Sequence, residues 1–541
     1  MTRRDLTGRY LIALTSALCM SAMATSAPSL AQGTLRIAMT ATDVPTTTGA
    51  PNNGFEGVRF MGFTAFDALV NWDLSSADKP ADITPGLAES WEQSKTDLTK
   101  WVFKLRQGVK FHDGTPFNAD ALIWNLDRSF NKDAKQFDPQ ASAINRGRPT
   151  YIADGGYKKI DDYTVELTTT RPISYFPYVL TTIFHVSPTA FEKAGSWAEF
   201  AKAPVGTGPF IARNFKPRIS IDLDKNKDYW DKNRIPKVDK VVLFPMPEAN
   251  TRLAALRSGQ VDWIEVPPPD AIAGLKGAGF SVVTNSYPHV WPWVLNTLKE
   301  ESPFRDVKVR QAINYCVDRD GLVTLLADTA EPSVGFFKKT DPRFGNPKNA
   351  YKFDPAMSKK LLAEAGYGPD KPVKAKIMIS TSGSGQMLPL PMNEFLQQSM
   401  KQCGFDISFE VVEWGTVLVN LRSVPTAPVA ANSDALNISL VSSDVSMIVR
   451  WFYGANSTPA GSNWGHWKNP DFDATIAKME SAPSKDEFDK SVVKLHEMLV
   501  DEAPWLWVVH DANPRAMTKG VQGFVSAQSW FQDLTRVSIG K

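Results

Sequence analysis

The sequence predicts an α/β protein that contains a partly parallel sheet. Lys374–Ser380 alternates apolar and polar residues, Asn393–Cys403 is amphipathic and is closed by Gly404, and residues 407–411 alternate again. Strand, helix and strand in this order form a βαβ unit, whose two strands are parallel. The composition supports a folded protein, because 43% of the 541 residues are hydrophobic and 22% are charged, as in ordinary soluble domains.

Further elements are expected along the first half of the chain. Thr34–Met39 alternates like a strand, and Trp101–Arg106 reads as a second strand. Gln107-Gly108 then turns the chain into residues 109–112, which predicts a short hairpin. Asn118 starts a helix that continues through Phe130. Short strand and helix patterns interrupted by frequent Pro and Gly residues, from about 75 to 205, predict a compact subdomain of mixed secondary structure.

Two helices are predicted in the second half. Asp306 is a natural N-cap, and the apolar residues from Val307 to Val317 follow helical spacing. Asp354-Pro355 places proline in the first turn of another helix, and Gly366 ends it.

The first 31 residues predict a secretory signal peptide. Arg3, Arg4 and Arg9 precede a short apolar run, and small residues lead to a cleavage site after Ala31. The alternative is an N-terminal membrane anchor, but the run is too short to span a bilayer well. No apolar stretch after residue 31 approaches eighteen residues. We therefore expect an exported mature protein without a membrane span, and either the general secretory or the twin-arginine route fits.

Charge and motifs exclude several classes. Sixty Lys and Arg against 58 Asp and Glu leave no basic excess of the kind that nucleic-acid proteins carry. The sequence has no P-loop and no G-x-S-x-G motif, and its six histidines are scattered. We expect no catalytic residues, no metal site and no cofactor, although a secreted hydrolase with a triad assembled across the fold stays the alternative from another class. The sequence leaves open whether Cys316 and Cys403 pair.

Four segments resemble the extracellular solute-binding proteins of the dipeptide- and oligopeptide-binding family, family 5, which serve ABC importers. Their order and spacing fit the family from about Thr34 to the C-terminus. They are Ile83–Trp91, Phe103–Phe117, Val205–Phe210 and Phe304–Ile313.

This resemblance implies a two-lobe periplasmic-binding-protein fold that closes on a solute about a hinge. Lobe I would comprise residues 32–285, with the inserted subdomain at about 75–205. Lobe II would comprise residues 286–508, and residues 509–541 would return to lobe I. The chain would cross between lobes near Asn285–Asn296 and near Val508–Asn513.

The resemblance also suggests residues that contact the solute. Asp444 lies where peptide-binding relatives place an acid for the ligand's α-ammonium, to which a desolvated carboxylate bonds strongly. Those relatives hold the ligand carboxylate with an Arg near a loop that corresponds here to Thr381–Met387, which has no cation; Arg450 is the substitute that we consider. The missing Arg argues against strict dipeptide specificity.

Tryptophans provide the other candidates, because a Trp offers a rigid apolar wall to a bound group. Trp414 stands in a Glu-Trp-Gly stretch that relatives share, Trp291 and Trp293 fall at the first predicted crossing, and Trp451 follows Asp444. Packing in the core is the alternative for each of them.

The preferred prediction is the periplasmic substrate-binding component of an ABC transporter, which captures a peptide-like solute by cleft closure and delivers it to a permease in the inner membrane. The protein would be a monomer whose ligand is a peptide or another small molecule, and nucleic acid is not expected as a partner. Within the same fold, the solute could instead be an oligosaccharide, an opine-like compound or another small polar molecule.

Overall fold

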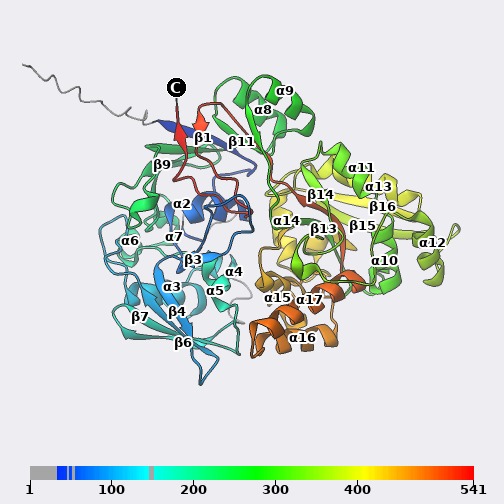
Figure 1. Cartoon of the computed structure of the whole chain (residues 1–541), viewed down its shortest axis with the longest axis horizontal. Helices are drawn as coiled ribbons and strands as arrows, with labels where there is room; N and C mark the ends of the chain where they lie inside the picture. The colour runs from blue at the N-terminus through cyan, green and yellow to red at the C-terminus, as the bar shows by residue number, and fades with distance from the viewer. Residues whose placement is uncertain (1–32, 46–47, 51–54, 145–150, 541) are drawn as a thin grey trace, which may run out of the picture.

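The computed structural model describes residues 33–45, 48–50, 55–144 and 151–540. The predicted signal peptide, residues 1–31, lies outside the described residues. Two lobes stand side by side, and two chain segments near the middle of the molecule connect them (Figure 1). In the described part of the chain, every helix is too short or too polar to cross a bilayer.

Lobe I is built on a mixed sheet whose strand order brings distant segments together. In order across the sheet the strands are β12 (Ser281–Val283), β20 (Arg515–Met517), β11 (Trp263–Glu265), β1 (Thr34–Met39), β10 (Lys240–Pro245), β9 (Ser220–Lys225) and β8 (Phe210–Lys216). β1 has the predicted bounds and pairs in parallel with both β10 and β11. Its Leu35, Ile37 and Met39 enter the core of the lobe, because alternate residues of a strand point to the same face.

Short helices complete lobe I. They are α1 (Phe55–Gly57), α2 (Phe63–Ala65), α5 (Phe176–Val179), α6 (Pro188–Ala194), α7 (Trp197–Phe200), α8 (Ala249–Arg257) and α9 (Ile272–Gly277), with a π-helical turn at Val58–Gly62. Two short ribbons, β2 (Val70–Trp72) with β3 (Ile83–Pro85) and β21 (Val521–Gln522) with β22 (Ser538–Ile539), lie outside the main sheet.

The inserted subdomain carries its own antiparallel sheet. Its order is β4 (Ala88–Gln93), β5 (Lys100–Leu105), β7 (Thr164–Thr169) and β6 (Ile152–Asp161), with α3 (Ala119–Phe130) and α4 (Pro139–Ile144) beside it. Asn118 caps α3 as predicted. The hairpin predicted at residues 101–112 is wrong, because β5 pairs with β4 and β7 instead. Lys110 instead forms an isolated antiparallel bridge with Pro116, and Phe111 N–H donates to Thr115 C=O across the turn at residues 112–114.

Lobe II contains a second mixed sheet and most of the long helices. The order is β14 (Ala330–Pro332), β19 (Trp505–Asp511), β13 (His289–Leu295), β17 (Ala435–Asn437), β15 (Val373–Ser380) and β16 (Phe405–Val412), and β18 (Leu440–Val441) pairs with β13. The helices are α10 (Val307–Tyr315), α11 (Arg319–Leu325), α12 (Pro355–Glu364), α13 (Pro389–Lys401), α14 (Trp414–Leu421), α15 (Val445–Phe452), α16 (Pro470–Glu480) and α17 (Lys485–Glu502).

The predicted βαβ unit of lobe II is confirmed. β15 and β16 are parallel over their full length, and α13 connects them. α13 begins at Pro389, before the predicted start, because proline fits the first turn of a helix. The N-caps predicted at Asp306 and Asp354 both accept a backbone N–H in the first turn.

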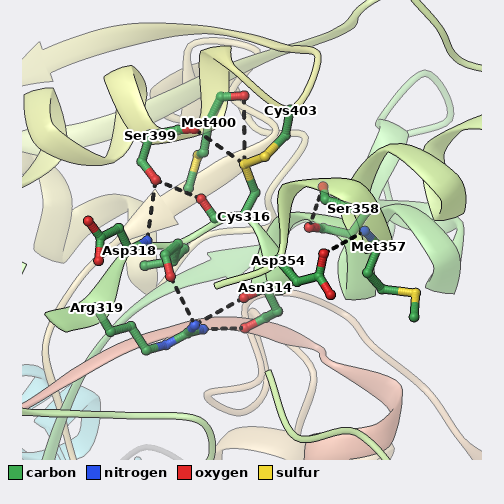
Figure 2. The surroundings of a disulfide bond; sticks show 12 residues. Asn314, Cys316, Asp318, Arg319, Asp354, Met357, Ser358, Ser399, Met400 and Cys403 are labelled. Carbon is green, nitrogen blue, oxygen red and sulfur yellow. Dashed lines mark hydrogen bonds between the residues drawn. A yellow bond between two sulfur atoms is a disulfide. The ribbon is translucent and has the colours of Figure 1, made fainter. Parts of the chain in front are cut away.

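A disulfide joins Cys316 to Cys403 and decides the pairing that the sequence left open (Figure 2). The two Cα atoms are 6.2 Å apart, within the normal range. Ser399 reinforces the link, since its hydroxyl donates to the carbonyl of Cys316 and accepts the N–H of Asp318. The bond therefore ties the end of α10 to the segment that follows α13.

The two lobes are connected by two chain crossings. The chain leaves the sheet of lobe I after Val283 and enters that of lobe II at His289; it returns between Asp511 and Arg515. β19 runs to Asp511, past residue 508, the predicted end of lobe II.

Candidate functional site

A cavity of about 230 Å³ lies between the lobes beside the crossings. We call it the hinge cavity. Lobe I contributes Trp72, Pro80, Ala81, Gln528 and Ser529, the crossings contribute Ser286, Tyr287, Pro288 and His510, and lobe II contributes Phe337, Lys338, Thr340, Asp341, Pro342, Arg343, Ser442 and Ser443. Residues from both lobes and both crossings therefore line one shared space.

A second interlobe cavity of about 530 Å³ adjoins the first at Arg343, which lines both. We call it the Asp444 cavity. Ser174, Tyr175 and Tyr178 line it from lobe I, and Arg343, Asp444, Val445, Ala482, Pro483, Ser484, Lys485, Phe488, Asp489 and Val492 line it from lobe II. The two cavities together extend from the hinge along the interface between the lobes.

Asp444 is fixed at the start of α15. Its carboxylate accepts the N–H of Ser446 at 2.8 Å and the hydroxyl of Ser443 at 2.7 Å, and the residue is buried. Burial, a hydrogen bond to Asp82 and the charge of Asp444 together raise the pKa of Tyr178 above its ordinary range. The carboxylate thus sits in the cavity opposite a phenol from the other lobe.

Arg343 is held in place by its own loop. Its guanidinium donates to Asp341 at 2.9 and 2.6 Å and lies 4.0 Å from the ring centre of Phe337. Although burial opposes the shift, the contacts with Arg343 lower the pKa of Asp341. The pair contributes no net charge where the two cavities meet.

The other predicted site residues do not line either cavity. Trp291 and Trp293 are 0% exposed in the core of lobe II, where their indole N–H groups donate to the Gln386 carbonyl and to the Asn393 side chain. Strand β13 is buried on both faces, so a Trp on it packs into the core even though the strand begins next to a crossing. We therefore leave both out of the site that we propose.

Trp414, Arg450 and Trp451 also lie away from these cavities. Trp414 is buried at the start of α14, against the loop that contains Gly383. Trp451 is buried in the same apolar cluster, and the half-buried Arg450 guanidinium lies 4.9 Å from its ring centre. Their contact with a solute stays a prediction.

The sequence reasoning missed the segment that lines much of the hinge cavity, residues 337–343. It carries three cations, Lys338, Lys339 and Arg343, of which Lys338 and Arg343 line the cavity. Cations clustered around Asp341-Pro342 were the available signal, but no spacing rule connects this segment to Asp444. Only the fold brings the two together.

The lobes are in direct contact on the side away from the hinge. Arg171 of the subdomain donates to both oxygens of Glu480 at the end of α16, at 2.6 and 2.8 Å, and the Tyr175 hydroxyl donates to Glu480 at 2.5 Å. Glu480 is buried by these lobe I partners. The structure therefore represents a closed arrangement.

The crossings themselves pack around a buried polar and aromatic cluster. Tyr287 donates to Asp511 at 2.8 Å. The His289 ring stacks with Tyr287 and with Trp530, at centroid distances of 5.1 and 4.8 Å, and those two rings lie 5.8 Å from each other. Arg59 of lobe I covers the Trp530 ring at 3.7 Å. Burial raises the pKa of Asp511 to about 6 and lowers that of His289 well below its usual value. The hinge is thus tightly packed.

One histidine with a strongly shifted pKa lies in the lining of the hinge cavity. Within the described ranges, no three His, Cys, Asp or Glu side chains gather as a metal site. The histidine that lines the hinge cavity, His510, donates from Nδ1 to the carbonyl of His289, and burial lowers its pKa to about 3. Two lobes joined by two crossings, with cavities between them, define the class of hinged solute-binding proteins.

The comparisons with known proteins agree. The model of bacterial extracellular solute-binding proteins, family 5 Middle, matches residues 82–473. The di/tripeptide-binding protein 2 of Pseudomonas aeruginosa is 26% identical over 514 residues, which cover 91% of this chain and 94% of that protein. The chain belongs to family 5 of the bacterial extracellular solute-binding proteins.

Solved structures have the same fold. The periplasmic binding protein DppA of Helicobacter pylori, in complex with the peptide STSA, superposes with a TM-score of 0.81 at 24% identity, over 95% of this chain and 99% of that chain. AgaA of Agrobacterium tumefaciens R10, in complex with agropinic acid, superposes with a TM-score of 0.78 at 23% identity, over 94% and 99%. The predicted two-lobe α/β fold is confirmed.

Proposed function

We propose that this chain captures a peptide-like solute in the periplasm by closure of its two lobes and delivers it to an ABC permease of the inner membrane. Export follows from the predicted cleavage after Ala31, and the mature chain acts as a monomer without catalysing a reaction. The observation that carries the proposal is the enclosure of Asp444 between the lobes, in a cavity that continues to the hinge.

A closed cleft binds its solute through contacts that exist only when both lobes meet, so the solute stabilises the closed state. Asp444 supplies an anionic oxygen in a partly dehydrated space, which suits the α-ammonium of a peptide. The family relationship and the di/tripeptide-binding relative support this solute class.

Asp444→Asn tests the assignment, because asparagine caps a helix as well as aspartate does and removes only the charge. We expect the variant to bind unmodified di- and tripeptides at least about tenfold more weakly, the size of one lost charge-assisted hydrogen bond. Isothermal titration of ligand-stripped mature protein measures this. N-acetylated peptides, which lack the ammonium, should bind both proteins weakly.

Asp471→Asn is the matched control, since Asp471 is exposed in the first turn of α16 and loses the same charge. Equal peptide affinity in Asp444→Asn and Asp471→Asn would refute the role of Asp444. A single co-purified sugar or opine in native mass spectrometry, with no peptide bound, would refute the solute class.

A further inference from the structure

We propose that Lys338 binds an anionic group of the solute in the hinge cavity, so that the solute lies with its cationic end at Asp444 and its anionic end toward the hinge. The inference rests on the proposed function and deepens it, because it names the residue that selects solutes with a free carboxylate.

The charges that line the hinge cavity single out Lys338. Among the described residues of its lining, the charged side chains are Lys338, Asp341 and Arg343. Asp341 and Arg343 neutralise each other through two hydrogen bonds. Burial keeps His510 neutral by lowering its pKa to about 3. The positive charge of Lys338 is therefore unmatched within the cavity.

Lys338 does have a partner outside the cavity, but a weak one. Its ammonium lies 2.9 Å from Glu331, whose side chain is 52% exposed, whereas the side chain of Lys338 is 15% exposed. Ion pairs with an exposed partner contribute little, because water screens them. The ammonium also donates to the hydroxyl of Ser286 on the first crossing, which leaves the third of its N–H donors for a solute.

The Asp444 cavity has the opposite imbalance. Lys485 pairs with Asp489 at 2.5 Å, and Arg343 is matched by Asp341. Asp444 accepts only from the neutral groups Ser443 and Ser446 in the contacts recorded for the described residues. The two cavities therefore present one anion and one cation on either side of Arg343, which fits a solute with separated charges of opposite sign.

The loop that would hold a carboxylate in dipeptide-binding relatives is not available for this purpose. Thr381–Met387 has no cation, and it packs inward. A Cβ on Gly383 would lie 2.4 Å from the Trp414 ring, and one on Gly385 would lie 2.5 Å from the Ser439 hydroxyl. Lys338 thus supplies the missing positive charge from a different loop.

The test compares the dipeptide Ala-Leu and the tripeptide Ala-Ala-Leu with their C-terminal amides, by isothermal titration on ligand-stripped mature protein. The wild-type protein should prefer the free acids about 10- to 100-fold, as expected for a charge-assisted hydrogen bond. Lys338→Met should abolish this preference by weakening the acids alone. Lys338→Arg should restore much of it, because the charge is kept.

Lys339→Met is the matched control, since the neighbouring Lys339 is exposed and does not line the cavity; it should retain the full preference. Equal binding of acids and amides by the wild-type protein, or equal preference in Lys338→Met and Lys339→Met, would overturn the inference and leave the proposed function standing. If Lys338→Met fails to fold, the wild-type comparison still tests the inference, because equal binding of acids and amides would refute it. Absence of binding for all four peptides would instead overturn the proposed function, and the inference with it.

Discussion

At the scale of single residues, Glu480 is a lobe II carboxylate whose recorded partners all come from lobe I. Arg171 and Tyr175 donate three hydrogen bonds to it across the interface. These bonds exist only while the lobes are closed, because domain opening separates α16 from the subdomain. We therefore expect Glu480 to contribute to solute affinity through the closed state, without lining either cavity that we describe.

Glu480→Gln should weaken solute binding about five- to thirtyfold, which corresponds to about 1–2 kcal/mol from the lost charge of this part-buried bridge. Small-angle scattering should also find a larger open fraction at subsaturating solute. Glu394→Gln on the exposed face of α13 is the control and should change neither quantity. Wild-type affinity in Glu480→Gln would contradict this role.

At the scale of elements, the loop of residues 337–343 depends on helix α17. His496 of α17 accepts the N–H of Phe337 at Nε2 and donates to the Phe344 carbonyl from Nδ1, at 3.0 and 2.8 Å. The chain that leads into this loop is fixed at Ser333, whose carbonyl accepts a hydrogen bond from the buried Arg319. Lys338 and Arg343 thus reach the hinge cavity on a segment held at both ends.

His496→Ala should lower the free energy of unfolding by about 2–4 kcal/mol, since it leaves a buried N–H unpaired and opens a cavity. It should also weaken solute binding because the loop is released. Urea unfolding and titration calorimetry measure the two effects. Lost stability with unchanged affinity would show that the loop keeps its position without α17.

The disulfide acts at the same scale, because it connects α10 to α13 across 87 residues of sequence. Cys316→Ser with Cys403→Ser should destabilise the protein by about 3–5 kcal/mol through the greater entropy of the unfolded chain. Solute affinity should stay unchanged, since neither cysteine lines the two cavities. Urea unfolding curves of the variant and of the wild-type protein, with and without reductant, provide the measurement. Coincident curves for the variant and the wild-type protein without reductant would contradict the prediction.

At the scale of the whole molecule, buried histidines make stability depend on pH. Burial lowers the pKa of His112 and His496 to about 4 and of His185 and His510 to about 3. The unfolded chain binds these protons from about pH 6.5 downward, so the folded state loses stability as the pH falls below that value. Asp511, with its pKa raised to about 6, acts in the opposite direction between about pH 4 and 6.

The loss of folding stability caused by the histidines at acidic pH exceeds the gain caused by Asp511. At pH 5 each histidine should cost about 2 kcal/mol relative to pH 7.5, whereas Asp511 should recover only about 1 kcal/mol. The free energy of unfolding, measured in urea at pH 7.5, 6 and 5, should therefore fall steadily. A flat profile would mean that these side chains are hydrated in solution.

Sequence periodicity and capping identified most of the elements that we predicted. β1, α3, α10, α12 and the β15–α13–β16 unit were predictable because their local signals, such as Asp306 and Asp354 as caps, agree with the tertiary context. The hairpin at residues 101–112 failed because β4, distant in sequence, pairs with β5. The predicted tryptophans illustrate the same limit, since burial of Trp291 and Trp293 depends on the sheet around them.

The sequence by itself determined the α/β class, the family and the candidate acid Asp444, because these depend on local patterns and on motifs in a fixed order. Only the tertiary structure decided the pairing of Cys316 with Cys403 and the position of Lys338 beside the hinge. Both depend on contacts between segments far apart in the chain, whose closeness is set by how the two sheets and their helices pack. The spacing of residues along the sequence does not encode how close such segments lie in the folded protein.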